Sequence, residues 1–422
     1  MPPASHVPHG SPCNLRSPLS PLQKQSISPR PSPLGPLPPP PLLPPPPAPA
    51  SAFSSVLSSL VRSGSIWMDK KNMGSYRYKN RTFSEGPEDA SGAFSDCNSD
   101  RSGEFALASQ FTNRLLVSSA ADSCYSDDLV RSLVADLESD SVEAQRRAAM
   151  ELRLLAKHSM DNRLKIARAG AVRPLVSLIS SADPQLQEHG VTAILNLSLC
   201  DENKDAIAAA GAIKPLVRAL KSGTTAAKEN AACALLRLGQ VEDHKVAIGR
   251  SGAIPPLVGL LETGSLRGKK DAATALYTLC GGARENKVRA VQAGVMRPLL
   301  ELMADGESGM ADKAAYVMHT VVQGVGEARA AVVEEGGIPV LVEMVEAGKQ
   351  REKEVAAAVL LLICEESVAY RGMVAREGAI PPLVELSQTG TTKARQKAEA
   401  LIGLLRQPRL GSSRWRASDA SE

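Results

Sequence analysis

One seven-residue motif, Gly-Ala-Ile/Val-x-Pro-Leu-Val, returns through the chain at a nearly constant interval. Clean copies begin at Gly170, Gly211, Gly252 and Gly378, and looser copies begin at Gly294 and Gly336. The interval between successive copies is therefore 41 or 42 residues. A period of about 40–47 residues is typical of helical solenoids, in which each repeat packs only on its neighbours. The motif therefore predicts a stack of repeated helical units that works as a binding surface.

Turn and capping residues predict three helices within each period. In the first period we expect Asn162 to be the N-cap of a short helix, and Gly170 to end that helix in the left-handed conformation. Pro174 then lies in the first turn of a second helix, where its missing N–H costs nothing. Asp183-Pro184 opens the third helix as N-cap and first helical residue. Full repeats are expected to start near Asn162, Asn203, His244, Asn286, Ala328 and Tyr370.

Composition divides the chain into four regions. Residues 1–67 are rich in Pro and Ser, with 19 prolines in the first 50 residues, and we expect them to be disordered. Residues 68–125, rich in Ser, Asp and Gly, are expected to be a second disordered linker. Ordered structure is expected over 126–406, as a partial N-terminal cap repeat followed by six full repeats, with a disordered tail at 407–422.

The first region leaves several interpretations open. It has no acidic residue before Asp69 and many serines, which is typical of organelle transit peptides, whereas its prolines oppose an amphipathic helix. A regulatory segment is the alternative. Its polyproline runs also predict binding to SH3-, WW- or profilin-like surfaces.

Net charge, apolar runs, cysteine spacing and short motifs give no indication of a catalytic site, a metal site, nucleic-acid binding or a membrane span. The net charge is only +4, which gives no reason to expect nucleic-acid binding, and no apolar run is long enough to span a membrane. The seven cysteines form no CxxC pair and no zinc-site spacing, so we expect small buried core residues and no metal. Phosphate-loop, nucleophile-elbow and His-Glu-x-x-His motifs are absent, so we expect no cofactor and no enzymatic activity.

Two segments carry a family resemblance. Gln187–Ser198 and Lys228–Leu236, together with the Gly-Ala-Ile-x-Pro-Leu-Val turns, resemble the armadillo repeats of plant U-box/armadillo proteins over about Ser126 to Arg406. The resemblance implies an all-α, right-handed superhelical solenoid. A U-box begins with a Cys-Pro-Ile type segment, and no such segment is present. We therefore expect an armadillo-only relative that lacks ligase activity of its own.

The resemblance also implies a groove lined by the third helices. Asn196 matches the family's groove asparagine, which bonds the backbone of an extended peptide. Stepping by the period predicts a partner-binding groove made of Asn196, Arg237, Thr278 and Thr320, then Thr192, Thr274 and Tyr316 one turn earlier, and His189, Asn230, Asp271 and Lys313 two turns earlier. The fifth groove position is Leu362, so only one of five is Asn. Trp67 and Trp415 both lie outside the repeats, which argues against import-signal binding of the importin kind.

These observations favour a non-catalytic scaffold or adaptor that binds extended partner segments, in ubiquitin-linked plant signalling according to the resemblance. One alternative is a nuclear import adaptor. Another is a ubiquitin ligase component that needs a partner for activity. We expect a monomer in the cytoplasm, the nucleus or both, with protein partners and no contact with a membrane.

Overall fold

The computed structural model describes residues 127–407, and every regular element in this range is a helix. The all-α prediction is therefore confirmed for this part of the chain. The two N-terminal regions predicted to be disordered, and the tail from residue 408 onward, lie outside the described residues. The first helix is α3 (Asp127–Leu137), and α4 (Val142–His158) follows with Ser141 as its N-cap.

Six units of three helices follow this first pair. The first helices are short: α5 (Met160–Arg168), α8 (Asp201–Ala209), α11 (Glu242–Arg250), α14 (Arg284–Gln292), α17 (Gly326–Glu334) and α20 (Val368–Arg376). The second helices are α6 (Val172–Ile179), α9 (Ile213–Ser222), α12 (Ile254–Thr263), α15 (Met296–Ala304), α18 (Gly337–Ala347) and α21 (Ile380–Thr389). The third helices are α7 (Pro184–Leu197), α10 (Thr225–Leu238), α13 (Leu266–Cys280), α16 (Ala311–Val322), α19 (Gln350–Glu365) and α22 (Thr392–Leu405).

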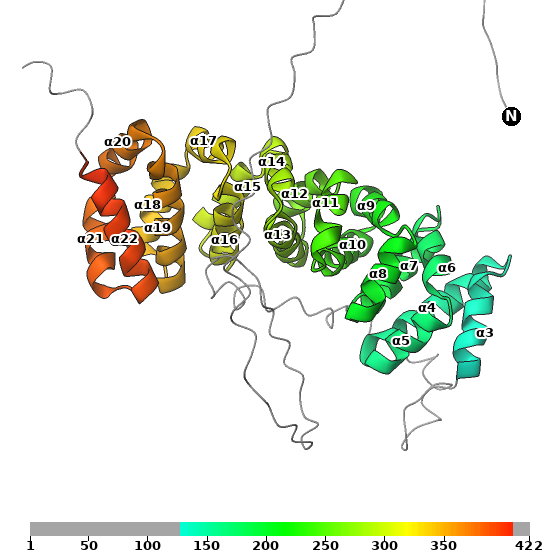
Figure 1. Cartoon of the computed structure of the whole chain (residues 1–422). Coiled ribbons are helices and arrows are strands. Elements are labelled where there is room, and N and C mark those ends of the chain that lie inside the picture. Colours follow the sequence, from blue (N-terminus) through cyan, green and yellow to red (C-terminus); the bar gives the residue numbers. More distant parts are fainter. Residues whose placement is uncertain (1–126, 408–422) are drawn as a thin grey trace, which may run out of the picture. The chain divides into compact units, whose positions relative to one another are not determined.

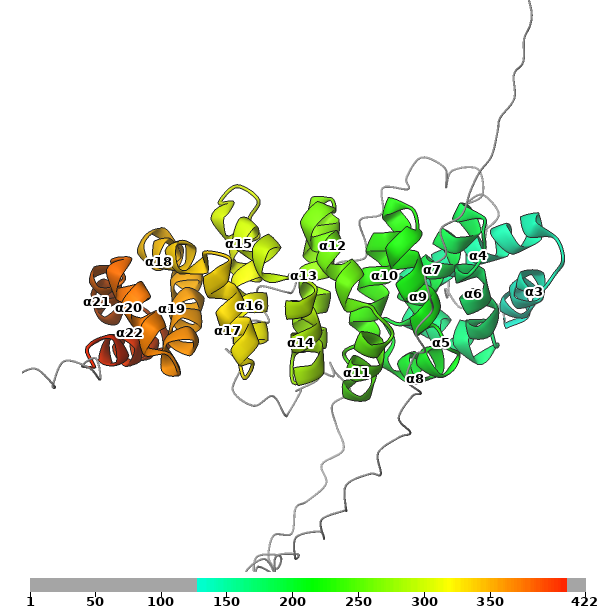
Figure 2. The same cartoon turned by 90° about the horizontal axis from the view of Figure 1, so that it is seen from above.

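The units stack in chain order (Figure 1). Each third helix packs on its own second helix and on the third helices of the neighbouring units, so α4, α7, α10, α13, α16, α19 and α22 form one continuous row. Figure 2 shows α11, α14 and α17 along one edge of the stack and α12, α15 and α18 along the other. Helices of distant units do not pack together, which is the arrangement expected of a solenoid.

The repeated motif is the joint between the first and second helices. Its glycine has a positive φ, for example 90° at Gly170 and 81° at Gly211, so a side chain there would be strained. The following alanine and the leucine of the motif, such as Ala171 and Leu175, are fully buried in the core. Pro174 lies in the first turn of α6, as predicted. The motif therefore recurs because backbone geometry and packing both require it.

The predicted N-cap at Asn162 is wrong. Helix α5 begins at Met160, and its N-cap is Ser159, whose hydroxyl accepts from the Asn162 backbone N–H. The Asn162 side chain is buried inside the helix, where Nδ2 donates to the Leu155 carbonyl over 3.2 Å. A buried amide that gains such bonds avoids a desolvation cost, so the asparagine ties its helix to the preceding third helix.

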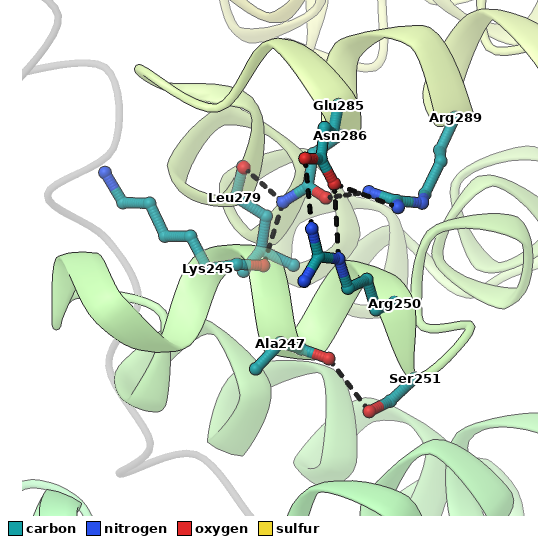
Figure 3. Close-up of polar contacts among 8 residues, drawn as sticks. All are labelled: Lys245, Ala247, Arg250, Ser251, Leu279, Glu285, Asn286 and Arg289. Atoms are coloured by element: carbon teal, nitrogen blue, oxygen red, sulfur yellow. Dashed lines mark hydrogen bonds and ion pairs between the residues drawn. The ribbon is translucent and has the colours of Figure 1, made fainter. Parts of the chain in front are cut away.

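The same arrangement recurs at Asn203 and Asn286. Asn286 Nδ2 donates to the Leu279 carbonyl (2.8 Å) and to the Lys245 carbonyl of the preceding unit (2.9 Å), and Arg289 donates to its Oδ1 (Figure 3). Asn203 donates likewise to the carbonyls of Leu197 and Arg163. At Asn203 and Asn286 the buried amides therefore join three helices each.

A lysine follows Asn203, His244 and Asn286, and each lysine reaches the far end of its own unit. The buried Lys245 ammonium donates to the Gly281 carbonyl (3.0 Å), and the Lys287 ammonium donates to the Gln323 carbonyl (2.8 Å). Lys204 donates to the side-chain Oε1 of Gln240 (2.7 Å) at the corresponding place. These acceptors lie just after a third helix, where free carbonyls and the helix dipole favour a positive charge.

Candidate partner-binding face

The eleven predicted groove residues lie on four successive third helices, α7, α10, α13 and α16. We call them the third-helix face. None of them is exposed. Asn196, Asn230, Asp271, Thr274, Lys313 and Tyr316 are buried, and Thr192, His189, Arg237, Thr278 and Thr320 are half-buried. Much of this face is therefore occupied by contacts within the protein.

At the N-terminal end, the groove asparagine is bonded to the neighbouring helix. Asn196 Nδ2 donates to the Arg153 carbonyl of α4 over 2.9 Å. The Arg153 guanidinium lies 2.9 Å from His189 Nδ1, and an arginine only donates, so this ring nitrogen accepts. Asn196, Arg153 and His189 thus form one connected group across α4 and α7.

In the middle of the face, one arginine joins two helices. Arg267 donates to Asn230 Oδ1 (2.8 Å), while Asn230 Nδ2 donates to the Thr192 hydroxyl (2.9 Å). The same guanidinium lies 3.6 Å from a carboxylate oxygen of Glu229 and 3.6 Å from one of Asp271. Arg267 therefore connects a polar chain that runs from α7 through α10 to α13.

The charge of Asp271 depends on this environment. Burial, and to a smaller extent the nearby Glu229 carboxylate, raises the pKa of its carboxyl to about 6. Arg267, Arg237 and Lys313 act in the opposite direction by favouring the ionised form. Three cations from α10, α13 and α16 thus act on one buried carboxyl in the middle of the third-helix face.

Towards the C-terminal end, two of the predicted threonines bond within their own helices. The Thr274 and Thr320 hydroxyls donate to carbonyls four residues earlier in their own helices, Lys270 and Tyr316. Val355 and Ala358, on α19, are buried, and Leu362 is half-buried. The face thus changes from a bonded polar network to an apolar surface along the stack.

Comparison with known proteins agrees with this architecture. The family model of the plant U-box protein ARM repeat region matches residues 128–408. The chain belongs to this armadillo-repeat family. U-box domain-containing protein 4 of Arabidopsis thaliana is 54% identical over 72 residues, which are 17% of this chain and 9% of that protein. E3 ubiquitin-protein ligase SPL11 of Oryza sativa subsp. japonica is 52% identical over 73 residues, 17% of this chain and 10% of that protein.

The aligned parts therefore span only about a tenth of these relatives' own lengths. Among solved structures, an engineered protein is similar with a TM-score of 0.59 and 28% identity, over 67% of this chain and 68% of that one. A computationally designed armadillo-repeat protein for modular peptide recognition is similar with a TM-score of 0.52 and 25% identity, over 55% of this chain and 99% of that one. The predicted armadillo-repeat fold is therefore confirmed.

Within this armadillo region, sequence reasoning missed the position eight residues before each groove position. It is always polar or charged: Arg146, Glu188, Glu229, Lys270, Asp312 and Glu354. Several of these side chains contact the N-cap of the next third helix. Arg146 donates to Asp183 (2.8 Å), Thr224 donates to Glu188 (2.9 Å), Ser265 donates to Glu229 (2.5 Å) and Thr391 donates to Glu354 (2.5 Å). We call this contact the N-cap link, and its recurrence at 41 or 42 residues is the signal that could have revealed it.

The His, Cys, Asp and Glu side chains of residues 127–407 form no group of three that could hold a metal ion. Cys200, Cys233, Cys280 and Cys364 are buried and free, as predicted, and burial raises the pKa of the Cys280 thiol to about 12. No helix in this range combines the length and apolar character needed to cross a bilayer.

Proposed function

We propose that this armadillo-repeat protein is a non-catalytic scaffold that binds extended segments of partner proteins along the third-helix face. The observation that carries the proposal is the continuous row of third helices, which presents half-buried Arg237, Thr278 and Thr320 at one helical register. A surface with one position per unit suits a chain in extended conformation, because each unit contacts the next few residues. Similarity to an armadillo design made for modular peptide recognition supports this proposal.

A screen of random extended peptides against the full chain tests it. We expect binders whose affinity falls at least tenfold in an Arg237→Glu, Thr278→Arg double variant. Arg218→Glu, Lys221→Glu is the matched control, because both residues are exposed on α9, a second helix. Binders that respond equally to both variants, or only to the control, would place the binding surface elsewhere.

The nature of the partner is part of the proposal. The relatives carry names of U-box proteins and of an E3 ubiquitin ligase, so we propose a role as a substrate adaptor or competitor in ubiquitin-linked signalling. An autoubiquitination assay with the purified full chain and a panel of conjugating enzymes should show no product. Product formation would indicate a ligase instead. Because residues 1–126 lie outside the described range, the expected lack of a U-box stays a prediction.

The import-adaptor alternative predicts a different ligand. Arg237, Arg267 and Lys313 put positive charge in the middle of the third-helix face, which opposes a basic import signal. We therefore expect a fluorescently labelled basic import-signal peptide to bind more weakly than about 10 µM. Micromolar or tighter binding that is lost in the Arg237→Glu, Thr278→Arg variant would support the adaptor.

We further propose that the protein is a monomer in the cytoplasm, the nucleus or both. Sedimentation tests the oligomeric state, and a fluorescent fusion in plant cells tests the localisation.

A further inference from the structure

Helix α16 starts later within its unit than the other third helices do. The N-caps of the other third helices lie 13 residues before the groove position, as Thr224 does before Arg237 and Ser265 before Thr278. In α16 this place belongs to Glu307, yet the helix begins at Ala311 and its N-cap, Met310, makes no side-chain capping bond. Nearly one turn of helix is therefore unwound, on the helix that follows the centre of the third-helix face.

The unwound turn is held by local bonds. Asp305 Oδ1 accepts from the backbone N–H groups of Glu307 (3.1 Å) and Ser308 (3.2 Å). Gly309 has a φ of 63°, which a helix does not allow, and a Cβ added there would meet nothing within 4 Å. Asp305, which accepts these bonds, also lines a small cavity together with Lys269 of α13 in the preceding unit.

The N-cap link is absent on both sides of α16. On the preceding helix the linking position is Lys270, and the residue it would meet is Glu307, a pair of opposite charge like Arg146 and Asp183. Within residues 127–407, neither the Lys270 ammonium nor the Glu307 carboxylate has a hydrogen-bond or ion-pair partner. On the following side Lys349 bonds instead within α19, through its backbone N–H to Glu352.

We propose that residues 307–310 are a two-state turn. In the first state, which is the state of this structure, the turn is unwound and the Lys270 ammonium has no hydrogen-bond or ion-pair partner among the described residues. In the second state the turn winds into α16, Glu307 becomes the N-cap, and its carboxylate pairs with Lys270 as Asp183 pairs with Arg146. The wound state exchanges the bonds of Asp305 for a longer α16 and the Glu307–Lys270 pair. If the third-helix face binds partners, as proposed above, an anionic group on the partner would compete with Glu307 for Lys270.

Hydrogen exchange of backbone amides 311–313 in the full chain tests the turn without any partner, because these N–H groups gain helical acceptors at residues 307–309 only in the wound state. Gly309→Ala disfavours the positive φ of the unwound state and favours helix, so these amides should exchange about tenfold more slowly. Gly306→Ala is the matched control, since Gly306 lies in the same loop without a positive φ and its exchange profile should match the wild type. Equal or faster exchange in Gly309→Ala would overturn the proposal.

A charge exchange gives a second, independent readout. Glu307→Lys places two cations together in the wound state, so exchange of amides 311–313 should become faster in the Gly309→Ala background. Adding Lys270→Glu should restore the slow exchange, because the pair then has its charges reversed. A double variant that exchanges as fast as Glu307→Lys alone would show that Lys270 and Glu307 never meet, and would overturn the proposed wound state.

Discussion

Two glycines of this chain are required for different reasons. Gly211 has a φ of 81°, and a Cβ added there would meet nothing within 4 Å, so only its backbone conformation excludes other residues. Gly249 lies inside helix α11 with ordinary helical geometry, and there a Cβ would stand 1.8 Å from Oδ1 of Asn286. The first residue shapes a turn, and the second makes room for a buried amide.

Replacing Gly211 by Val should therefore destabilise the protein through backbone strain alone. We expect a loss of about 1–2 kcal/mol of unfolding free energy, the usual cost of the left-handed conformation in a residue with a side chain. Thermal unfolding followed by circular dichroism measures it. An unchanged melting temperature would contradict the assigned role of the glycine.

Gly249→Ala should destabilise the protein although alanine is the better helix former. The added methyl group displaces the Asn286 amide from its bonds to Leu279 and Lys245, at a cost of about 2 kcal/mol. Gly259→Ala on helix α12 is the control. Its Cβ would meet nothing within 4 Å, so that change should stabilise by up to about 1 kcal/mol. Urea unfolding compares the two variants, and effects of equal sign would refute the steric argument.

At the scale of elements, the third helices hold one another through polar side chains as well as apolar packing. Arg267 alone contacts Glu229 and Asn230 on α10 and Asp271 on its own helix. Its removal leaves two largely buried carboxylates of like charge close together. Removing Arg267 should therefore lower the unfolding free energy by more than the intact contacts contribute, because both carboxylates stay buried without its opposite charge.

Arg267→Met should lower the unfolding free energy by about 2 kcal/mol. Much of that loss should disappear when Asp271→Asn is present, since the second change removes one of the uncompensated charges. A double-mutant cycle from urea unfolding measures the coupling. Strictly additive effects of the two changes would show that Arg267 and Asp271 do not interact.

At the scale of the whole molecule, two buried groups give opposite dependences on pH. Burial raises the pKa of Asp271 to about 6, so the folded state holds its proton where the unfolded state has lost it. This contribution favours folding below about pH 4 and is lost as the pH rises through 6. Burial, together with the nearby Lys397 and Lys287, lowers the pKa of His319 to about 4. The histidine's contribution is therefore present above pH 6.5 and is lost as the pH falls towards 4.

Asp271→Asn should consequently be more stable than the wild type at pH 7.5, by about 2 kcal/mol, because it removes a buried ionised carboxyl. The gain should shrink as the pH falls towards 4.5, where the wild-type carboxyl is already protonated. Unfolding midpoints in urea between pH 4.5 and 7.5 test this, with His319 unchanged in both proteins. A gain that is constant across that range would contradict the burial of the Asp271 charge.

Local signals predicted the elements well but not the roles of several side chains. Gly170, Pro174 and Asp183 mark joints and caps where the sequence indicated, because each acts on the backbone within a few residues. Asn162 was misassigned, since the capping bond is made by Ser159, and the asparagine's partner is a carbonyl of the preceding helix. The late start of α16 was not predicted either, because it depends on Asp305 and Gly309 stabilising a competing turn.

The period of the repeats and the all-helical fold could be derived from the amino-acid sequence, because they follow from backbone geometry and from the spacing of apolar residues. Which polar side chains meet could be read only from the folded protein. Lys245 and Gly281, Thr224 and Glu188, and Asn286 and Lys245 lie 36, 36 and 41 residues apart, on different helices. Their contacts depend on how helices pack within a unit and between units, and no local propensity encodes that arrangement.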